Sequence, residues 1–343
     1  MIYVNKSREI DAREWWTILD QLGLREKLIG ARTLVIKPNL AAGTYVAPQN
    51  HVISDLSLLA SALEFFHEAN PAATLYIAES DSTGYGFAYL KFEHLGLPGS
   101  LGLSRSTEEK VKLLDMTRDR LRQVEDGRLL WYTNVDRQLW LSETLLNADF
   151  TVSLSNLKTH AVTGYTGACK NLFGCLPDFD KSVNHPRIHR VIHDLTLAVH
   201  PDLSVVDAFY GMERNGPVQG IDVDTGYRVF SDDALEADLY AASTIGYPPK
   251  KIGYLKKLAK TLGRPVEATA AVITPYHRAG RFLRVMNAVG LFFQRCGQGI
   301  ALFGHRIHSC PTPGVLVITI VRPLLLRMFD YEKLKAWKRK ILK

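Results

Sequence analysis

The hydrophobic positions of the chain form short apolar runs that alternate with longer stripes at helical spacing. Short β-branched runs are typical of buried strands, and apolar residues every three or four positions are typical of helices. The expected strands are Thr33–Lys37, Thr74–Ala78, Lys110–Leu114, Leu129–Thr133, Phe150–Leu154 and Leu203–Val206. The expected helices are Ser54–Ala69, Phe87–Leu95, Leu141–Ala148, Arg187–Val199 and Asp232–Ile245, with Ser54 or Asp55 capping the first and Ser231 the last.

This alternation predicts an α/β fold with a mostly parallel sheet and flanking helices. Ligands of such sheets bind outside the carboxyl ends of the strands. Polar clusters follow the expected strands: Lys37-Pro38-Asn39, Glu79-Ser80-Asp81, Ser155–His160 and Asp207. We therefore expect a single site at the C-terminal ends of the strands.

The sequence changes character after Pro249. Lys250–Leu262 predicts a lysine-rich helix, and Arg278–Gln294 and Arg322–Lys343 are basic stretches that carry aromatic residues. We expect residues 1–248 to form the α/β domain. Residues 249–343 are then a basic, partly helical C-terminal region that packs on this domain or extends from it.

Composition is ordinary for a globular protein, with 46% hydrophobic and 22% charged residues. The net charge of +7 is uneven, because thirteen Lys and Arg follow His277 against only Asp330 and Glu332. Basic stretches with Phe and Trp suit an anionic membrane surface. A solvated basic face over an ordinary helix is the alternative, and no nucleic-acid motif occurs.

The N-terminus lacks the apolar core of a secretory signal, and the apolar run Val315–Val321 is too short to span a bilayer. We expect a cytoplasmic protein that can associate peripherally with a membrane. None of the four cysteines is spaced as CxxC, which argues against an iron–sulfur cluster or a zinc ribbon. Cys169 and Cys175 are either ligands or small buried hydrophobes.

The segment Ser155–His185, called the motif segment below, concentrates cationic and hydroxyl side chains between glycines. Glycine lets a backbone approach a ligand, and lysines stabilise an anion. His160, Lys170 and His185 are the catalytic candidates, since histidine can act as a base or a metal ligand. The expected substrate-binding residues are Lys37, Asn39, Lys158, Thr163, Thr166, Asn171 and Lys181. The segment is not a phosphate-binding P-loop, because GxxxxGK[ST] is absent.

Carboxylates at neighbouring strand ends complement this segment. Glu79, Asp81 and Asp207 are the candidate ligands of a divalent metal, or they serve as acid and base. Helix capping and solvation at the surface are the alternative roles.

The chain resembles the domain-of-unknown-function family numbered 362. The resemblance covers about Thr33–Gly246 and is carried by IKPNL, AESDSTG, LSNLKTHAVTGYTGACKNLFGCLP, VDAFYGMERNGPVQG and SDDALEAD. It implies a fold and the place of a site, because the family has no general assigned reaction. Many members carry a ferredoxin-like segment with two four-cysteine clusters, which the four cysteines here cannot form.

A more distant resemblance is to the nickel-pincer lactate racemase family. His160, Gly164, Gly167, Lys170 and His185 (or His189) follow the order of its active-site loop. This resemblance implies that His160 is the catalytic base, Lys170 the amine bonded to cofactor or substrate, and His185 a ligand.

Three functions follow from these observations. The first is an enzyme that binds a small anionic substrate, with a metal or a covalently held cofactor left open. The second is a redox accessory protein without its own iron–sulfur cluster. The third is a binding protein that attaches to a membrane surface through the basic C-terminal region.

Overall fold

The structure is a computed structural model that describes residues 1–40, 51–82, 87–132, 138–160, 162–178, 181–214, 216–217, 220–267 and 270–277. The chain divides into two compact units, Met1–Gly280 and Arg281–Lys343. The second unit lies outside the described residues, and with it the stretches expected at Arg278–Gln294 and Arg322–Lys343.

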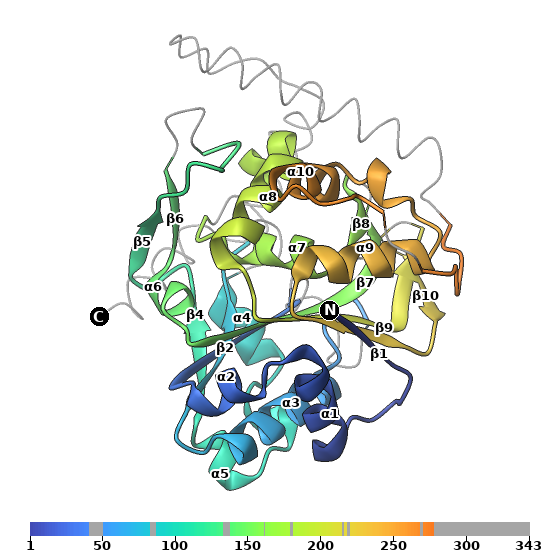
Figure 1. The fold of residues 1–343 in the computed structure, drawn as a ribbon. Coiled ribbons are helices and arrows are strands. Elements are labelled where there is room, and N and C mark those ends of the chain that lie inside the picture. The colour runs from blue at the N-terminus through green and yellow to red at the C-terminus, as the bar shows by residue number, and fades with distance from the viewer. Residues whose placement is uncertain are drawn as a thin grey trace, which may run out of the picture. The chain divides into compact units, whose positions relative to one another are not determined.

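A twisted sheet runs through the first unit (Figure 1). Within the described residues it has nine strands in the order β1-β11-β9-β7-β2-β3-β4, with β8 paired to β7 and β10 paired to β9. The five strands from β9 to β4 are mutually parallel. The strand bounds are β1 Ile2–Asn5, β2 Thr33–Pro38, β3 Thr74–Glu79, β4 Val111–Asp115, β7 Phe150–His160, β8 Gly164–Thr166, β9 Leu203–Glu213, β10 Ile221–Asp224 and β11 Arg228–Ser231. This arrangement confirms the predicted α/β class with a mostly parallel sheet.

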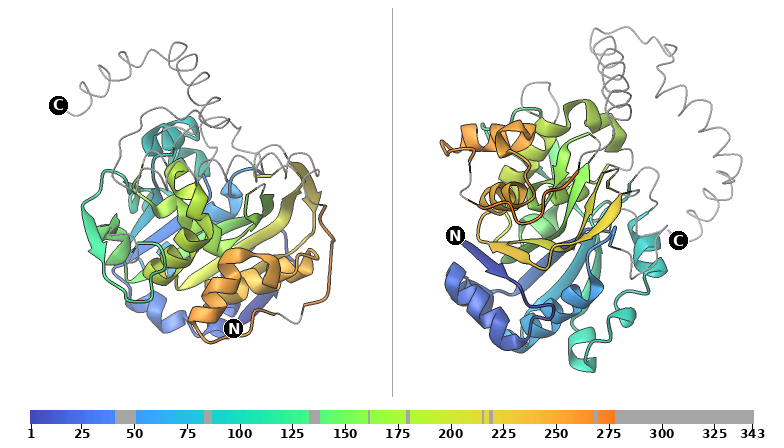
Figure 2. Two further views of the ribbon diagram at one scale, coloured as in Figure 1. Left: turned by 90° about the horizontal axis from the view of Figure 1, so that it is seen from above. Right: turned by 90° about the vertical axis from the view of Figure 1, so that its right-hand side faces the viewer.

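Helices cover both faces of this sheet (Figures 1 and 2). On one face lie α1 Ala12–Leu22, α2 Arg25–Gly30, α3 Leu56–Ala69, α4 Ala88–His94, η1 Gly99–Leu101 and α5 Arg105–Glu108. On the other lie α7 Ala168–Asn171, η2 Leu172–Cys175, η3 Lys181–Arg187, α8 Ile188–Val199, α9 Ala234–Thr244, η4 Pro249–Lys251 and α10 Gly253–Thr261. A separate hairpin, β5 Leu121–Val124 and β6 Leu139–Ser142, leads into α6 Glu143–Leu146.

Alternation along the strands divides the core into two clusters, one on each face of the sheet. In β2, Leu34 and Ile36 are buried on the side of α1 and α3, whereas Val35 is buried on the side of α7 to α10. This follows from the two-residue period of a strand, which sends successive side chains to opposite faces. Because both faces are covered, the strands are apolar along most of their length.

Most expected helices and strands are present, with three corrections. Leu129–Tyr132 is not a strand, because the backbone N–H groups of Leu130 and Trp131 donate to the Asp194 carboxylate instead of a strand partner. Leu141–Ala148 begins in β6, and only Glu143–Leu146 is helical.

The cap of α9 is the third correction. Asp233 caps this helix by accepting from the Glu236 N–H, whereas Ser231 ends β11 and its hydroxyl accepts from the Asp233 N–H. Strands β7 and β9 both run several residues beyond their predicted ends. Their extensions carry the polar part of the motif segment and the acidic residues that follow Val206.

The beginning of the expected C-terminal region packs on the α/β domain. In α10, Tyr254, Leu255 and Leu258 are buried in the same cluster as residues of α8 and α9. Where the structure describes the chain, it contains no helix that is both long enough and apolar enough to cross a membrane.

Candidate functional site

The ends of β2 and β3 bring a lysine and a glutamate together at one edge of the sheet. Ile36 is the register partner of Ile77, so the residues that follow them leave the sheet side by side. The Nζ atom of Lys37 lies 3.1 Å from Oε2 of Glu79, and both side chains are buried. Lys91 approaches the same carboxylate from α4, with 3.7 Å between its Nζ and Oε1.

The Glu79 carboxylate is fully engaged. It accepts hydrogen bonds from the backbone N–H of Ser80 at 2.9 Å and of Leu40 at 3.3 Å. Burial opposes its ionisation, but the charges of Lys37, Lys91 and Lys181 outweigh burial and lower its pKa to about 2. Glu79 therefore remains an anion that holds lysines in place.

Lys181 reaches the same edge from η3. Its Nζ donates to the Ser80 hydroxyl and lies 3.4 Å from the Gly174 carbonyl oxygen. Burial lowers its pKa to about 7; the Glu79 charge opposes this, and the charges of Lys91 and Lys37 add to it. The lysine ammonium groups here outnumber the carboxylate, so part of their charge is uncompensated.

A second group of donors lies where β7 and β8 form a short antiparallel pair. Lys158 and Thr166 are direct register partners, so their side chains lie on the same face of this pair. Lys158 is 1% exposed and donates to the Val52 carbonyl oxygen. Burial and then the Lys170 charge lower its pKa to about 7, while the Asp222 carboxylate acts in the opposite direction.

Thr166 is unusual because its hydroxyl oxygen is buried and has no hydrogen-bond partner among the described residues. The residue is only 6% exposed. Unsatisfied buried hydroxyls are uncommon in proteins because desolvation without a partner is costly. A ligand oxygen beside Lys158 would supply the missing partner.

His160 ends β7 and remains partly exposed. Its Nδ1 accepts from the backbone N–H of Val162 at 3.1 Å and of Thr163 at 3.3 Å. Burial, followed by the positive charges of Lys170 and other neighbouring side chains, lowers the pKa of His160 well below 6.5. The neutral ring therefore carries its proton on Nε2, which is a hydrogen-bond donor in this tautomer.

Lys170 lies on α7, with its Nζ 4.8 Å from the ring centroid of Phe173. Partial burial and the Lys37 charge lower its pKa to about 8. His185 comes from η3 and contacts the same phenylalanine: the centroids of the His185 and Phe173 rings lie 5.6 Å apart. All three catalytic candidates therefore come from segments that meet at the C-terminal edge of the sheet.

Asp238 on α9 holds the turn from β8 into α7. Its buried carboxylate accepts from the backbone N–H of Ala168 at 2.7 Å and of Cys169 at 3.1 Å, and from the Tyr165 hydroxyl at 3.2 Å. A Cβ on Gly167 would stand 2.1 Å from the same carboxylate, so glycine is required for this approach. Asp238 thus fixes the start of the helix that presents Lys170.

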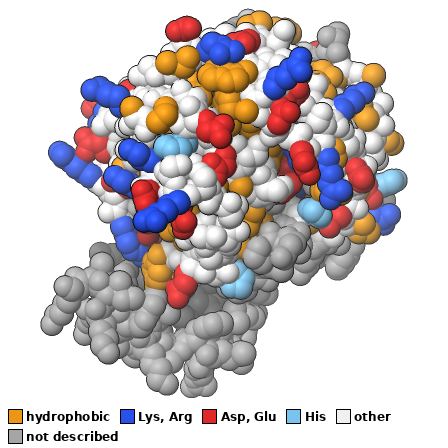
Figure 3. Space-filling view, turned by 90° about the horizontal axis from the view of Figure 1, so that it is seen from below, with side chains coloured by type: hydrophobic (Ala, Val, Ile, Leu, Met, Phe, Trp, Pro, Cys, Tyr) orange, Lys and Arg blue, Asp and Glu red, His pale blue; other side chains and the backbone are white. Residues whose placement is uncertain are grey.

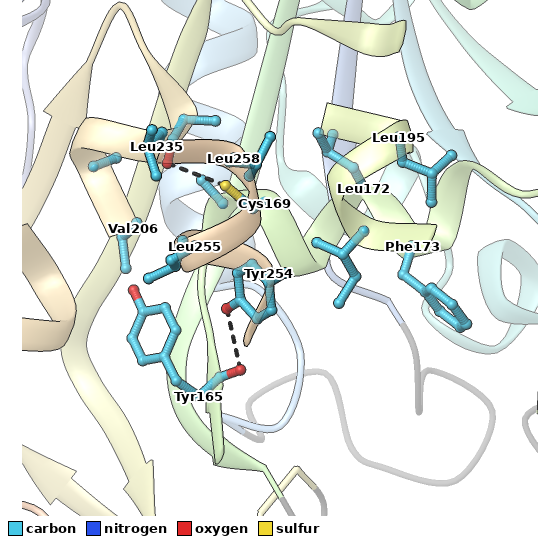
Figure 4. Packing of buried hydrophobic residues seen from close by; sticks show 14 of the residues in the cluster. Tyr165, Cys169, Leu172, Phe173, Leu195, Val206, Leu235, Tyr254, Leu255 and Leu258 are labelled. Carbon is cyan, nitrogen blue, oxygen red and sulfur yellow. Dashed lines mark hydrogen bonds between the residues drawn. The ribbon is translucent and has the colours of Figure 1, made fainter. Parts of the chain in front are cut away.

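Figure 4 shows the packing behind this turn, where Tyr165 and Cys169 lie among Leu235 of α9 and Leu255 and Leu258 of α10. The Cys169 thiol donates to the Ala234 carbonyl oxygen, and the Tyr254 hydroxyl donates to the Tyr165 carbonyl oxygen. Burial raises the pKa of both Cys169 and Cys175. These properties favour the small buried hydrophobe over the reactive thiol.

Three predicted substrate-binding residues make contacts within the protein. The Asn171 amide donates to the Lys37 carbonyl oxygen at 2.8 Å, and the Thr163 hydroxyl donates to the Tyr165 carbonyl oxygen at 2.9 Å. The Asn39 backbone N–H donates to the Ser54 hydroxyl at 2.8 Å. These contacts shape the loops around the lysines.

Each of the three proposed metal ligands forms an ion pair with a cation of the protein, Glu79 with Lys37 as described above. Asp81 pairs with Arg118 at 2.9 Å, and Asp207 pairs with Arg228 at 3.1 Å. Asp207 lies within β9, opposite Asn156, and not at the end of a strand. No group of three His, Cys, Asp or Glu side chains suited to a metal ion occurs in the part of the chain that the structure describes.

Lys91, like Asp238, is a site residue that the sequence did not reveal. It is 1% exposed, and besides Glu79 it contacts the Ser80 carbonyl oxygen at 2.8 Å. Its position between Leu90 and Phe92, inside an otherwise apolar helix start, is a signal that it is buried. A buried lysine is rare unless it is paired or functional.

The site as a whole has an excess of buried positive charge. Four lysines are buried and a fifth is partly buried: Lys37, Lys91, Lys158 and Lys181, and then Lys170. Among the described residues, the carboxylate within 4.0 Å of any of these amines is that of Glu79. On the face shown in Figure 3, by contrast, Lys and Arg are interspersed with Asp and Glu wherever side chains are described. The excess is therefore a feature of the site, and such a field attracts an anion.

These features define an α/β protein with a lysine-rich site at the carboxyl edge of its parallel strands. The chain belongs to the family described as domain of unknown function (DUF362), which matches residues 34–243. This confirms the family expected from the sequence.

Two known proteins are similar to this chain. The thylakoid-associated protein sll1697 of Synechocystis sp. (strain PCC 6803) is 27% identical over 246 residues, covering 69% of this chain and 70% of that protein. The lactate racemase apoprotein of Thermoanaerobacterium thermosaccharolyticum aligns with a TM-score of 0.43 and 10% identity, covering 71% of this chain. The aligned part spans 56% of the racemase chain.

Proposed function

We propose that this protein is an enzyme that binds a small anionic substrate between the motif segment and the ends of β2 and β3. The observation that supports this most is the excess of buried lysine over carboxylate. Several of these amines have depressed pKa values, because burial and like charges disfavour their protonation. A bound anion would reduce the repulsion between the lysines. It would also accept a hydrogen bond from the Thr166 hydroxyl, which has no partner among the described residues.

The catalytic part of the proposal rests on His160 and Lys170. The neutral His160 ring would donate from Nε2 to an oxygen on which negative charge develops during the reaction. Lys170, with a pKa of about 8, would exchange a proton with substrate near neutral pH or, as the free amine, act as a nucleophile. The base role that the racemase resemblance implies for His160 would require the proton to move to Nδ1. His185 would orient the substrate from η3.

A turnover experiment tests this function. The purified protein is incubated in D2O with mixtures of small carboxylates and phosphate esters, and proton NMR follows loss of signal or deuterium exchange. We expect one substrate to change with the wild type and with Lys112→Ala, an exposed lysine outside the site. His160→Ala and Lys170→Ala should abolish the change. Absence of turnover, together with absence of any melting shift across the mixtures, would exclude the proposal.

A divalent metal and a covalently held cofactor remain predictions. Metal analysis and intact mass measurement of the protein as purified test them directly. A stoichiometric metal, or added mass that maps to Lys170, would place that group in the site.

A second candidate is attachment to an anionic membrane surface, favoured by the basic residues after His277 and by the thylakoid association in the name of the relative. Full-length protein and the variant Lys338→Gln, Arg339→Gln, Lys340→Gln are sedimented with anionic and neutral vesicles. Selective loss of sedimentation with anionic vesicles supports the candidate. Equal sedimentation of the variant and of a Lys256→Gln, Lys260→Gln control excludes a role for these residues.

A further inference from the structure

The site contains a second group of donors, besides the lysines that form ion pairs with Glu79. Its members are Lys158 and His160 on β7, Thr166 on β8, and Lys170 on α7. The Lys158 and Thr166 side chains share one face, because the two residues are direct register partners. His160 lies two residues after Lys158 on β7 and so projects to the same face of the strand pair. The Lys170 charge acts on both Lys158 and His160, which is consistent with a position of Lys170 beside this face.

Each of these four side chains can act as a hydrogen-bond donor. The Lys158 ammonium uses one N–H on the Val52 carbonyl oxygen and has two left. The Nδ1 atom of His160 accepts from backbone N–H groups, so the proton of the neutral ring is on Nε2. The Thr166 hydroxyl has no acceptor among the described residues. Neither Lys158 nor Lys170 forms an ion pair with a described carboxylate within 4.0 Å. The missing component is thus an acceptor with several oxygens.

Two members of this donor set can be reached from solvent. His160 and Lys170 are partly exposed, whereas Lys158 and Thr166 are buried. A group entering past His160 and Lys170 would end against Lys158 and Thr166. The buried pair would therefore recognise the terminal oxygens of the ligand.

Charge and shape distinguish the candidate groups. A carboxylate offers two oxygens in one plane and a single negative charge. A phosphoryl group offers three terminal oxygens directed to three sides and carries a charge of about −1.5 to −2 at pH 7. The donor set consists of two lysines and two neutral donors from three separate elements. It matches a phosphoryl group better than a carboxylate, because a single phosphoryl group can balance both ammonium charges.

We infer that the substrate is a phosphomonoester whose phosphoryl group is held by Lys158, Thr166, Lys170 and the Nε2–H of His160. This inference rests on the proposed function and adds the chemical class of the substrate. The glutamate-paired lysines, Lys37 and Lys91, are then a structural support for the neighbouring edge and not part of the phosphoryl site.

Isothermal titration of the full chain tests the inference, with inorganic phosphate, sulfate, acetate and malonate as probes at constant ionic strength. We expect phosphate and sulfate to bind at least about tenfold more tightly than acetate or malonate. Thr166→Val should weaken phosphate and sulfate about tenfold, the loss expected for one hydrogen bond to a charged group. Thr166→Ser should bind as the wild type does, which separates the hydroxyl from the fold.

The matched control is Thr196→Val, a buried threonine whose hydroxyl donates to Ile192 within α8. It should leave all four affinities unchanged. If acetate or malonate binds as tightly as phosphate, or if Thr166→Val binds phosphate as the wild type does, the phosphoryl site is wrong and anion binding still stands. If no probe binds, both the inference and the proposed function fail.

Discussion

Gly174 lies directly against the side chain of Lys37. A Cβ on Gly174 would stand 2.7 Å from Cε and 2.9 Å from Nζ of Lys37, and 3.3 Å from Oε1 of Glu79. The ion pair at the end of β2 and β3 therefore depends on the absence of a side chain in η2. Gly174 does not have a positive φ angle, so its backbone conformation does not require glycine. The close approach of Lys37 explains why a glycine stands at this position.

Gly174→Ala should displace Lys37 from Glu79 and destabilise the protein. We expect the free energy of unfolding to fall by about 1–3 kcal/mol, the usual cost of an added methyl group in a packed interior. Urea unfolding measures this, with Gly30→Ala as control, because a Cβ at Gly30 meets no atom within 4 Å. Equal stability of the two variants would show that Lys37 moves aside freely.

Glu79→Gln should destabilise the protein in a pH-dependent way. The folded-state pKa of Glu79 is about 2 against a reference of 4.5, so its ion pairs add stability above pH 4.5 and lose it as pH falls toward 2. At pH 7 the substitution leaves Lys37 and Lys91 without a counter-charge and should cost about 3 kcal/mol. The difference from wild type, followed by urea unfolding, should shrink below pH 4.5; a difference independent of pH would contradict the ion-pair role.

Lys158→Met should stabilise the ligand-free protein while abolishing anion binding. Burial lowers the folded-state pKa from 10.5 to about 7, so the charged amine costs stability below pH 7, and this cost disappears as pH rises toward 10.5. The gain is reduced because the Val52 carbonyl oxygen loses its donor, which leaves about 1–3 kcal/mol at pH 6. Thermal unfolding of the variant and the wild type at pH 6 and pH 10 measures this. A gain in stability that is larger at pH 10 than at pH 6 would contradict the prediction.

The tautomer of His160 can be observed by nitrogen NMR. We expect Nδ1 to be unprotonated and Nε2 protonated at pH 7, with no titration near pH 6.5, because burial and the neighbouring positive charges lower the pKa well below that value. A long-range proton–nitrogen spectrum of labelled protein distinguishes the two nitrogens. A proton on Nδ1, or a titration centred near pH 6.5, would remove His160 as a neutral donor.

The sequence predicted the place of the site because the carboxyl ends of parallel strands share one edge. That rule brought together Lys37, Glu79 and the end of β7 without any knowledge of side-chain positions. It gave the wrong place for Asp207, since β9 continues past this residue as an apolar strand and Arg228 from β11 meets its carboxylate inside the sheet.

Residues that act from helices on the sheet faces were harder to predict. Lys91 enters the site from α4 and Asp238 from α9, and neither belongs to a strand end. Their roles depend on how each helix packs across the sheet, which hydrophobic periodicity alone does not determine. The polarity of Lys91 within an apolar helix is the signal that was present, whereas Asp238 resembles an ordinary helical acid until the turn at Gly167 is placed beside it.

Proton uptake on anion binding is the most direct test of the central claim that depressed lysine amines receive an anion. Sulfate is titrated into the full chain at pH 8 in two buffers of different ionisation enthalpy, because sulfate itself does not titrate there. At pH 8 the amines of Lys158 and Lys181, with pKa values of about 7, are largely neutral. The amine of Lys170, with a pKa of about 8, is half neutral. The account predicts net uptake of protons, reduced in Lys170→Gln; binding without uptake, or no binding at all, would contradict it.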